Sequence, residues 1–559
     1  MPSGGLQLYL LRPIMLTASP PPVLRRPDPT PAVLSVTLFL LIFVSLTTSL
    51  FFKERWLWMD EAIGYTLLSD PSFAHMNRAL VSHMDANPPL FFYVYWPLAH
   101  AISLNPLFLK AVSTGLFATT IALFYRYTTR LVGAPVRNFI ITTVVVSLTY
   151  LNYTLSTQFR SYSLFLLISG LYFFVLHRLI RRPGDYRWLA AHLGSGLALV
   201  MVHNFGLLYV GASGSFFGLL WLESLRSAAI RTRRWAYFIV GLSHVVIIGL
   251  WALLWFANFR IQATAGQPHM WIPVPTVASV FRTVGEWIPA LPSRLEGSPA
   301  GWVLPVFRVL LLAGLFAFMA GPRLKRGIRA MISDDAFSVY VLSGYLLFVT
   351  TVVSLLVSLT VVSVFISRYL WPNHLLVLFQ LVYAGQYVAS SVRWSPRLTD
   401  RLPRRLPHLA LPLYVGLLMG FMFVQNRRVT LFTSDILTYL PRLDARYPIF
   451  FESAAYFLPV WQHQLANARF LLNWETAATP GNLPNATTDY KVLKALHDYY
   501  GVSAVVPASQ FTPAQFGHFY VVDEASRYQI ELFLARKQVR VVRVIPVSIA
   551  GHRILECTF

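Results

Sequence analysis

The stretch Trp56-Leu57-Trp58-Met59-Asp60-Glu61-Ala62 follows the first long apolar segment of this 559-residue chain. It places two adjacent carboxylates beside tryptophans in a protein of which only 12% of residues are charged. The same loop continues to Ser82-His83-Met84-Asp85-Ala86-Asn87-Pro88-Pro89. Tryptophan is typical of membrane–water interfaces, and a carboxylate held there is costly unless it has a partner or a task. A solvated loop with ordinary charges is the alternative, but the flanking residues favour a site at one membrane face.

Composition predicts a polytopic membrane protein. The chain is 56% hydrophobic and 15% aromatic, with a mean hydropathy of +0.55. A net charge of +23 could suggest nucleic-acid binding, but the cations form short clusters between apolar runs, which is the pattern of cytoplasmic loops. The single cysteine, Cys557, excludes an internal disulfide and a thiolate metal site. The clusters are Arg126/Arg130/Arg137, Arg178/Arg181/Arg182/Arg187, Arg226/Arg231/Arg233/Arg234, Arg323/Lys325/Arg326/Arg329 and Arg393/Arg397/Arg401/Arg404/Arg405.

The charge pattern predicts eleven crossings. If every second connection is cytoplasmic, all five clusters lie inside and the Asp60 loop lies outside. The apolar run 88–104 begins with two prolines and is expected to lie in the interface or dip into it. The alternative is a full span there together with one further crossing elsewhere, which would give thirteen crossings. The expected organisation is a cytoplasmic tail over 1–31, a transmembrane domain over 32–425 with a first outer loop at 53–105, and an extracytoplasmic domain over 426–559. The predicted spans are 32–52, 106–125, 138–157, 161–178, 188–203, 205–222, 235–256, 302–321, 336–362, 370–392 and 408–425.

Three polar junctions between spans fall on the same side as Asp60. They are Gln158-Phe159-Arg160-Ser161-Tyr162, His203-Asn204-Phe205 and Ser367-Arg368-Tyr369. Either arginine alone would be interpreted as an interfacial anchor, and His203 alone as a packing histidine. Two arginines on the face that carries paired carboxylates indicate a shared polar cavity. The long connection from residue 259 to 301, rich in proline and tryptophan, could cover that cavity as a lid.

The last part of the chain predicts a small α/β domain. After residue 426, short apolar runs such as 447–451, 469–472, 519–522 and 539–545 alternate with helical patterns at 454–465 and 527–537. This region has no Gly-rich phosphate loop and no metal-spaced Cys/His set.

Five motifs in order resemble one enzyme group. They are the Asp60-Glu61 pair, Asp85-x-x-Pro-Pro-Leu, Arg160-x-Tyr162, His203-x-Phe-Gly and Arg368-Tyr369-Leu-x-Pro. From about residue 32 to 425 the chain resembles the GT-C integral-membrane glycosyltransferases, in the bacterial branch similar to protein O-mannosyltransferases and lipid A aminoarabinose transferases. The resemblance implies a polyprenyl-phosphate-linked hexose or pentose donor and transfer on the periplasmic face of a bacterial inner membrane. It departs from the family at Gln158, where relatives often carry a glutamate.

Glycosyl transfer to a hydroxyl needs a base and cations that stabilise the departing phosphate. Asp60 is the candidate base, and Glu61 and Asp85 could orient the acceptor or bind a divalent cation such as Mg, Mn, Ca or Zn. Arg160 and Arg368 are the candidates for the lipid phosphate, because a guanidinium can grip it bidentately. The remaining substrate-binding candidates are His83, Tyr162, His203 and Tyr369.

A direct displacement with Asp60 as base would invert the anomeric carbon. The expected partners are the lipid-linked donor, membrane lipids and a glycan, lipid or protein acceptor, with no nucleic acid. A transporter or flippase for a lipid-linked sugar is the alternative and would use the same basic cavity without chemistry. The chain shows no internal repeat of the kind that is common in transporters, and its polar cluster is one-sided.

Overall fold

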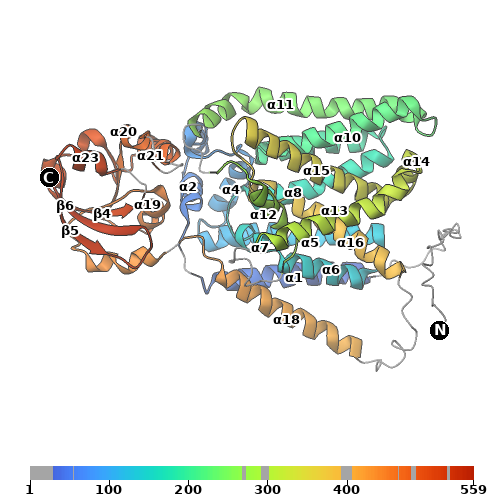
Figure 1. Ribbon diagram of the computed structural model, residues 1–559, viewed down its shortest axis with the longest axis horizontal. Helices are drawn as coiled ribbons and strands as arrows, with labels where there is room; N and C mark the ends of the chain where they lie inside the picture. Colours follow the sequence, from blue (N-terminus) through green and yellow to red (C-terminus); the bar gives the residue numbers. More distant parts are fainter. Residues whose placement is uncertain are drawn as a thin grey trace, which may run out of the picture.

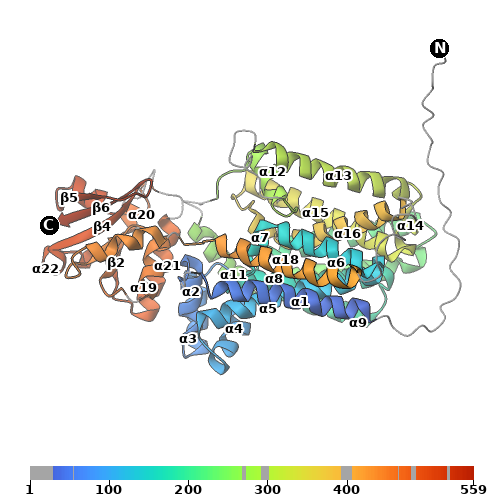
Figure 2. The ribbon, with the colours of Figure 1, turned by 90° about the horizontal axis from the view of Figure 1, so that it is seen from below.

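The computed structural model describes residues 29–53, 56–266, 272–290, 301–391, 406–432, 434–463, 465–479, 482, 486–525 and 529–559. The predicted cytoplasmic tail, 1–31, lies outside the described residues except for 29–31. A bundle of long helices forms the larger part of the molecule, and a smaller domain with the C-terminus sits at one end of it (Figures 1 and 2). The short helices α2 (Met59–Leu68), α3 (Phe73–Ala79) and α4 (Leu90–Ala101) lie between the two parts.

Each of the eleven predicted spans is helical in the structure. Seven of the described helices, from Thr30–Leu50 to Asp335–Thr360, are long and apolar enough to cross a membrane. The segment 138–157 is divided at Thr149 into two helices, α6 (Pro135–Leu148) and α7 (Tyr150–Leu155). The predicted polytopic helical fold is confirmed. Its other long helices are α1 (Thr30–Leu50), α5 (Pro106–Val132), α8 (Ser161–Arg181), α9 (Tyr186–Val202), α10 (Gly206–Arg226), α11 (Arg234–Gly266), α13 (Val303–Leu324), α15 (Asp335–Thr360), α16 (Asn373–Ser391) and α18 (Leu406–Arg428).

Helix α4 is too short to cross a bilayer. Its 12 residues rise roughly 18 Å at about 1.5 Å each, against a hydrocarbon core of about 30 Å. The first loop folds around it, because the indole Nε1 of Trp96 donates to the backbone oxygen of Asp70 at 2.8 Å. With α2, α3 and the π-helical turn η1 (Leu80–Met84), α4 forms a compact group of short helices.

The cationic connections meet at the end of the bundle far from the small domain. Arg181 pairs with Asp335 at 2.6 Å, and Arg323 pairs with Asp334 at 3.3 Å. Arg233 also donates to the backbone oxygen of Arg181 at 3.3 Å. These contacts bring three clusters that are distant in sequence to one end, which α14 (Ile328–Ser333) marks in Figure 1.

The C-terminal domain is built on a six-stranded sheet in the order β3-β2-β1-β4-β6-β5. Strands β3, β2, β1 and β4 are parallel, whereas β6 is antiparallel to both β4 and β5. The predicted α/β architecture is confirmed. Its elements are β1 (Ile449–Phe451), α19 (Ala454–Gln462), β2 (Ala468–Leu472), α20 (Trp474–Ala477), α21 (Ala486–Tyr500), β3 (Val505–Pro507), α22 (Pro513–Phe516), β4 (His518–Glu524), α23 (Glu531–Ala535), β5 (Arg540–Pro546) and β6 (His552–Thr558).

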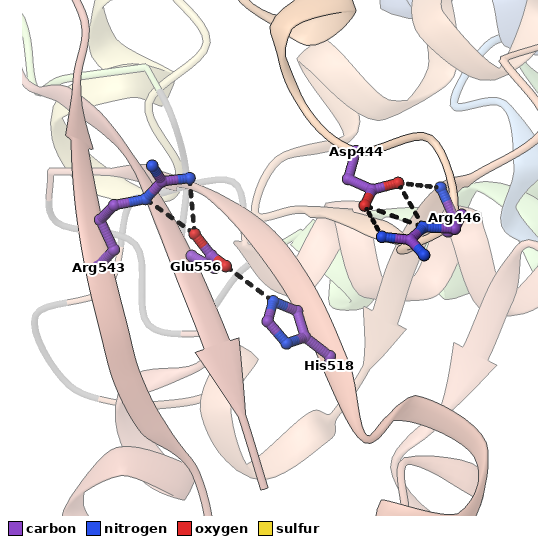
Figure 3. Close-up of polar contacts among 5 residues, drawn as sticks. All are labelled: Asp444, Arg446, His518, Arg543 and Glu556. Carbon is purple, nitrogen blue, oxygen red and sulfur yellow. Dashed lines mark hydrogen bonds and ion pairs between the residues drawn. The ribbon is translucent and has the colours of Figure 1, made fainter.

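Ion pairs across neighbouring strands stabilise the antiparallel edge of this sheet. Glu556 on β6 lies between His518 on β4, at 3.0 Å, and Arg543 on β5, at 2.8 Å (Figure 3). In the same view, Arg446 donates to Asp444 in the loop before β1, and these hydrogen bonds lower the pKa of Asp444 to about 2. Each of these charges therefore has a structural partner within the domain.

The C-terminal domain packs against the first loop. Helix α19 contacts α2, and α21 contacts η1. Two hydrogen bonds join the parts: Gln462 Nε2 donates to Thr66 Oγ1 at 2.9 Å, and the Tyr500 hydroxyl donates to Asp70 Oδ2 at 3.0 Å. The loop that carries Asp60 is therefore held between the bundle and the domain.

Candidate active site

The two adjacent carboxylates occupy the first turn of α2 and face different surroundings. Successive helical side chains point in directions about 100° apart, so two adjacent residues can face different surroundings. Glu61 turns inward: it is 1% exposed, pairs with Lys110 Nζ of α5 at 3.0 Å, and accepts the backbone N–H of Phe159 at 3.4 Å. The Asp60 side chain keeps 18% of its surface exposed. Glu61 therefore fixes α2 in place, and Asp60 is the more accessible carboxylate.

Arg160 joins the two halves of the first loop. It precedes α8, and its Nη1 donates to Asp85 Oδ2 at 2.5 Å and to the backbone oxygen of Asp60 at 3.1 Å. Its Nη2 lies 4.0 Å from Asp60 Oδ2. Burial alone would lower the pKa of Arg160, but the carboxylates of Asp85 and Asp60 raise it, so the guanidinium stays charged. The structure thus brings together three of the predicted residues.

Asp85 is buried, with 5% of its surface exposed, and both of its carboxylate oxygens accept hydrogen bonds. Its Oδ1 accepts both the backbone N–H and the side-chain amide of Asn87 at 2.8 Å. Next to it, Asn204 Nδ2 donates to the backbone oxygen of Ala86 at 3.0 Å. The second half of the loop is therefore anchored to the His203 junction.

Arg368 lies in the short 3-10 helix η5 (Ser367–Leu370) at the same end of the bundle. Its guanidinium carbon is 5.4 Å from the centroid of the Tyr369 ring. Burial alone would lower the pKa of Arg368, but Tyr162, Tyr369 and Asp60 raise it. The Tyr369 ring lies 5.6 Å from the His203 ring between centroids, so the Arg368 loop meets the His203 junction although the two are far apart in the sequence.

His203 is buried between the two arginines and aromatic rings. Its ring stacks on Phe165 at 4.8 Å between centroids, and the rings of Tyr162 and Tyr369 lie 6.0 Å and 5.6 Å away. Burial, followed by Arg160 and Arg368, lowers the pKa of His203 to about 3. Its Nδ1 accepts the backbone N–H of Phe205 at 3.2 Å. His203 is therefore neutral at physiological pH.

The glycine of the His-x-Phe-Gly motif has a packing reason. A Cβ added at Gly206 would lie 2.3 Å from the backbone oxygen of Leu199, which real Cβ atoms do not tolerate. Gly206 N also donates to the backbone oxygen of His203 at 2.8 Å. The tight turn from α9 into α10 depends on this contact, and it sets the position of His203.

The described part of the predicted lid packs on the Arg368 loop. Glu286, just after α12 (Val277–Gly285), accepts a hydrogen bond from the hydroxyl of Ser367. Trp287 is fully buried and donates to the backbone oxygen of Ser367 at 3.1 Å. The rest of the connection, including Trp271 and residues 291–300, lies outside the described residues.

Three charged residues of the site were not among the predicted ones. Lys110 pairs with Glu61, Glu286 supports the Arg368 loop, and Lys53 Nζ donates to Asn426 Oδ1 at 3.2 Å. Burial and Lys110 lower the pKa of Lys53 to about 7, while Glu61 opposes this shift. Lys110 carried a usable signal, because an isolated lysine within an apolar segment is a sign of function or pairing.

Two further positions from the sequence motifs are His83 and Gln158. His83 lies in η1, and its side chain is outside the described residues. Gln158 is 3% exposed and donates its amide to the backbone oxygen of Thr154 at 2.5 Å. The position that often carries a glutamate in relatives is thus occupied by a neutral group bonded to its own helical turn.

The carboxylates proposed for a cation already have cationic partners. Glu61 pairs with Lys110, and Asp85 pairs with Arg160. Within the described parts of the chain, carboxylates of three residues that could together hold a metal ion meet in the C-terminal domain, at Glu452, Asp523 and Glu531. There Glu452 accepts backbone N–H groups of Glu524 and Gln529 at 3.0 Å and 3.3 Å, so it has a structural task.

Comparison with known proteins shows a likeness in structure but not in sequence. The chain matches no family model and no curated protein. Its structure is similar to two crystal structures of ArnT from Cupriavidus metallidurans, one in the apo state and one bound to undecaprenyl phosphate. The TM-scores are 0.51 and 0.50 at 12% identity, and the match covers 94% of this chain and 97% of ArnT. The protein therefore has the polytopic helical fold of ArnT, with seven described helices that are long and apolar enough to cross a membrane.

Proposed function

We propose that the protein is a glycosyltransferase that moves a sugar from a polyprenyl-phosphate donor to an acceptor hydroxyl. The observation that carries this proposal is the accessible carboxylate of Asp60, with the buried guanidinium of Arg160 4.0 Å away. Arg368 lies in the adjoining loop, whose Tyr369 ring contacts His203. A base next to two fixed cations suits a reaction that removes a proton from the acceptor and releases a phosphate. The ArnT structure with bound undecaprenyl phosphate supports the choice of a lipid-phosphate donor.

In the proposed reaction, Asp60 takes the proton of the acceptor hydroxyl as that oxygen attacks the anomeric carbon. The bond from this carbon to the phosphate oxygen breaks, and the lipid phosphate leaves with both bonding electrons. Arg160 and Arg368 stabilise the charge that develops on the phosphate. Attack on the face opposite the leaving group inverts the anomeric configuration.

The neighbouring carboxylates act through other residues. Glu61, buried against Lys110, positions the first turn of α2 and so aims Asp60. Asp85 positions Arg160 through their direct ion pair. A divalent cation at Glu61 and Asp85 stays a prediction, and it would have to compete with Lys110 and Arg160 for these oxygens.

The aromatic wall around His203 is proposed to contact the donor. Tyr162, Tyr369 and the neutral His203 ring can pack against a sugar or the first isoprene units and donate hydrogen bonds. With a pKa of about 3, His203 does not exchange protons near neutral pH. It therefore serves in binding and not as the general base. His83 stays a predicted contributor to substrate binding.

We also propose the orientation in the membrane. The cationic connections cluster at one end of the bundle, which the positive-inside rule assigns to the cytoplasm. Asp60, Arg160, Arg368 and the C-terminal domain then lie on the outer face of a bacterial inner membrane. In this arrangement residues 1–31 form a cytoplasmic tail, residues 32–425 the catalytic transmembrane domain and residues 426–559 a periplasmic domain.

The test of this function is a donor panel. Purified protein in lipid nanodiscs is given polyprenyl-phosphate hexoses and pentoses, and release of free polyprenyl phosphate is measured. We expect release with at least one donor, and its loss in Asp60→Asn. Movement of a labelled donor across a vesicle membrane without release of its sugar would support the flippase alternative and contradict the proposal.

Cysteine labelling tests the orientation. The native Cys557 is buried, so added cysteines can be distinguished from it. A cysteine at Ser103 or one appended to the C-terminus should react with an impermeant thiol reagent from outside intact cells, while one at Ser227 should react only after the membrane is opened. Protection at position 103 together with labelling at position 227 would contradict both the orientation and the eleven-crossing topology.

A further inference from the structure

A groove of about 630 Å³ lies between the first loop and the C-terminal domain. Its walls come from α2 and the following turn on one side, and from α19 and α21 on the other. The hydrogen bonds from Gln462 to Thr66 and from Tyr500 to Asp70 join these walls. A volume of this size is typical of ligand pockets, and the cross-wall bonds make the groove a preformed feature.

The lining of the groove combines aromatic rings with fixed polar groups. Tyr65, Trp461, Tyr499 and Tyr500 all line it. At its base, Asp70 is 4% exposed and accepts from the backbone N–H of Ser72 at 2.9 Å and from the Tyr500 hydroxyl. His75 Nδ1 contacts the same carboxylate at 2.5 Å. Rings beside immobilised hydrogen-bonding groups suit a sugar, which has apolar C–H faces and a rim of hydroxyls.

The residues that line the groove favour a neutral ligand over an anion. None of the described residues that line it is a lysine or an arginine, in a protein whose net charge is +23. Its acidic residue, Asp70, already contacts three groups, which are the backbone N–H of Ser72, the ring of His75 and the hydroxyl of Tyr500. A phosphate or carboxylate would find no lysine or arginine in this lining, and His75 is already held by Asp70, so a neutral ligand is favoured.

The groove and the candidate active site share one helix. Asp60 lies in the first turn of α2, and Thr66 in the groove is six residues further along the helix, which is roughly 9 Å at about 1.5 Å per residue. The Tyr65 ring also contacts Phe159, the neighbour of Arg160, at 6.5 Å between centroids. The groove therefore lies less than two helical turns from Asp60 along α2.

We infer that this groove binds a neutral sugar ring of a carbohydrate acceptor and directs an adjoining hydroxyl toward Asp60. This inference rests on the proposed function, because it names the class of acceptor for the same site. It commits to a carbohydrate, either as a free glycan or as the headgroup of a glycolipid.

The test compares matched variants in a binding assay. The full-length protein in nanodiscs is applied to immobilised neutral oligosaccharides, to the same oligosaccharides carried on lipid, and to unmodified peptides. We expect oligosaccharide binding that weakens about tenfold in Trp461→Ala and Tyr499→Ala, since an aromatic contact is worth about that much. Trp474→Ala is the control, because Trp474 is a 43% exposed tryptophan of the same domain outside the groove.

Each outcome decides the inference. Binding of both sugar forms supports a free glycan, and binding of the lipid-carried form alone supports a glycolipid, provided that Trp461→Ala weakens it and Trp474→Ala does not. Binding of peptides instead, binding of nothing, or equal loss in Trp474→Ala overturns it. Arg160→Ala should keep sugar binding while losing donor turnover. If no donor is turned over by wild-type protein, the proposed function fails although the groove still binds sugar.

Discussion

Replacing Asp60 by asparagine should lower turnover by at least about a hundredfold, since general base catalysis contributes roughly 10²–10⁴-fold. Asparagine keeps the size of the side chain but cannot accept a proton. The backbone oxygen of Asp60, which binds Arg160 at 3.1 Å, is unaffected by the change. The donor affinity should therefore stay close to that of the wild type, because the guanidiniums that are proposed to hold the phosphate remain in place.

The measurement pairs a donor titration with turnover at saturating acceptor, on variants whose folding is checked by gel filtration and thermal unfolding. Glu61→Gln is the control for the adjacent carboxylate. It should lower the unfolding temperature more than Asp60→Asn does, because it leaves Lys110 without its buried partner. Near-normal turnover in Asp60→Asn, with no turnover in folded Glu61→Gln or Asp85→Asn, would assign the base to one of those residues.

Removing the guanidinium of Arg160 or Arg368 should raise the apparent KM for the donor, slow transfer, or both. A charge-assisted hydrogen bond contributes about 1.5–3 kcal/mol, which corresponds to roughly ten- to a hundredfold in donor binding or rate. Lysine at either position should restore only part of this, because the bidentate fork is lost. Steady-state kinetics with varied donor measure the effect. Unchanged kinetics in both alanine variants would show that these arginines are interfacial anchors.

Arg160→Ala has a second consequence, which concerns the stability of the protein. It leaves the 5% exposed Asp85 without its ion-pair partner, and breaking a buried pair typically costs about 3–5 kcal/mol of stability. The double variant Arg160→Ala/Asp85→Asn should therefore regain much of the unfolding temperature but none of the donor affinity. Recovery of both would mean that Arg160 serves folding alone.

Much of the candidate site could be predicted because its residues lie at the ends of apolar segments. Hydropathy and charge parity together predicted Asp60, Arg160 and Arg368 on one face. In the structure Arg160 lies 4.0 Å from Asp60, and Tyr369, next to Arg368, contacts His203. The short helix α4 was also predictable, since its prolines and its length are local properties of the sequence. Local patterns of this kind depend on only a few neighbouring residues.

Which charged residue pairs with which depended on the tertiary structure. In the sequence, Asp60 and Glu61 are equivalent neighbours, and only the packing of α2 against α5 buries Glu61 on Lys110 and leaves Asp60 beside Arg160. The low pKa of His203 likewise follows from its burial, and then from Arg160 and Arg368, which belong to other junctions. The groove needed the docking of α19 and α21 onto the first loop, nearly four hundred residues away in the chain. The sequence alone thus determined which segments are helical and apolar and which polar residues lie at their ends, because hydropathy is local. The fold decided which of them are paired, buried or open to a ligand, because those properties depend on contacts between distant segments.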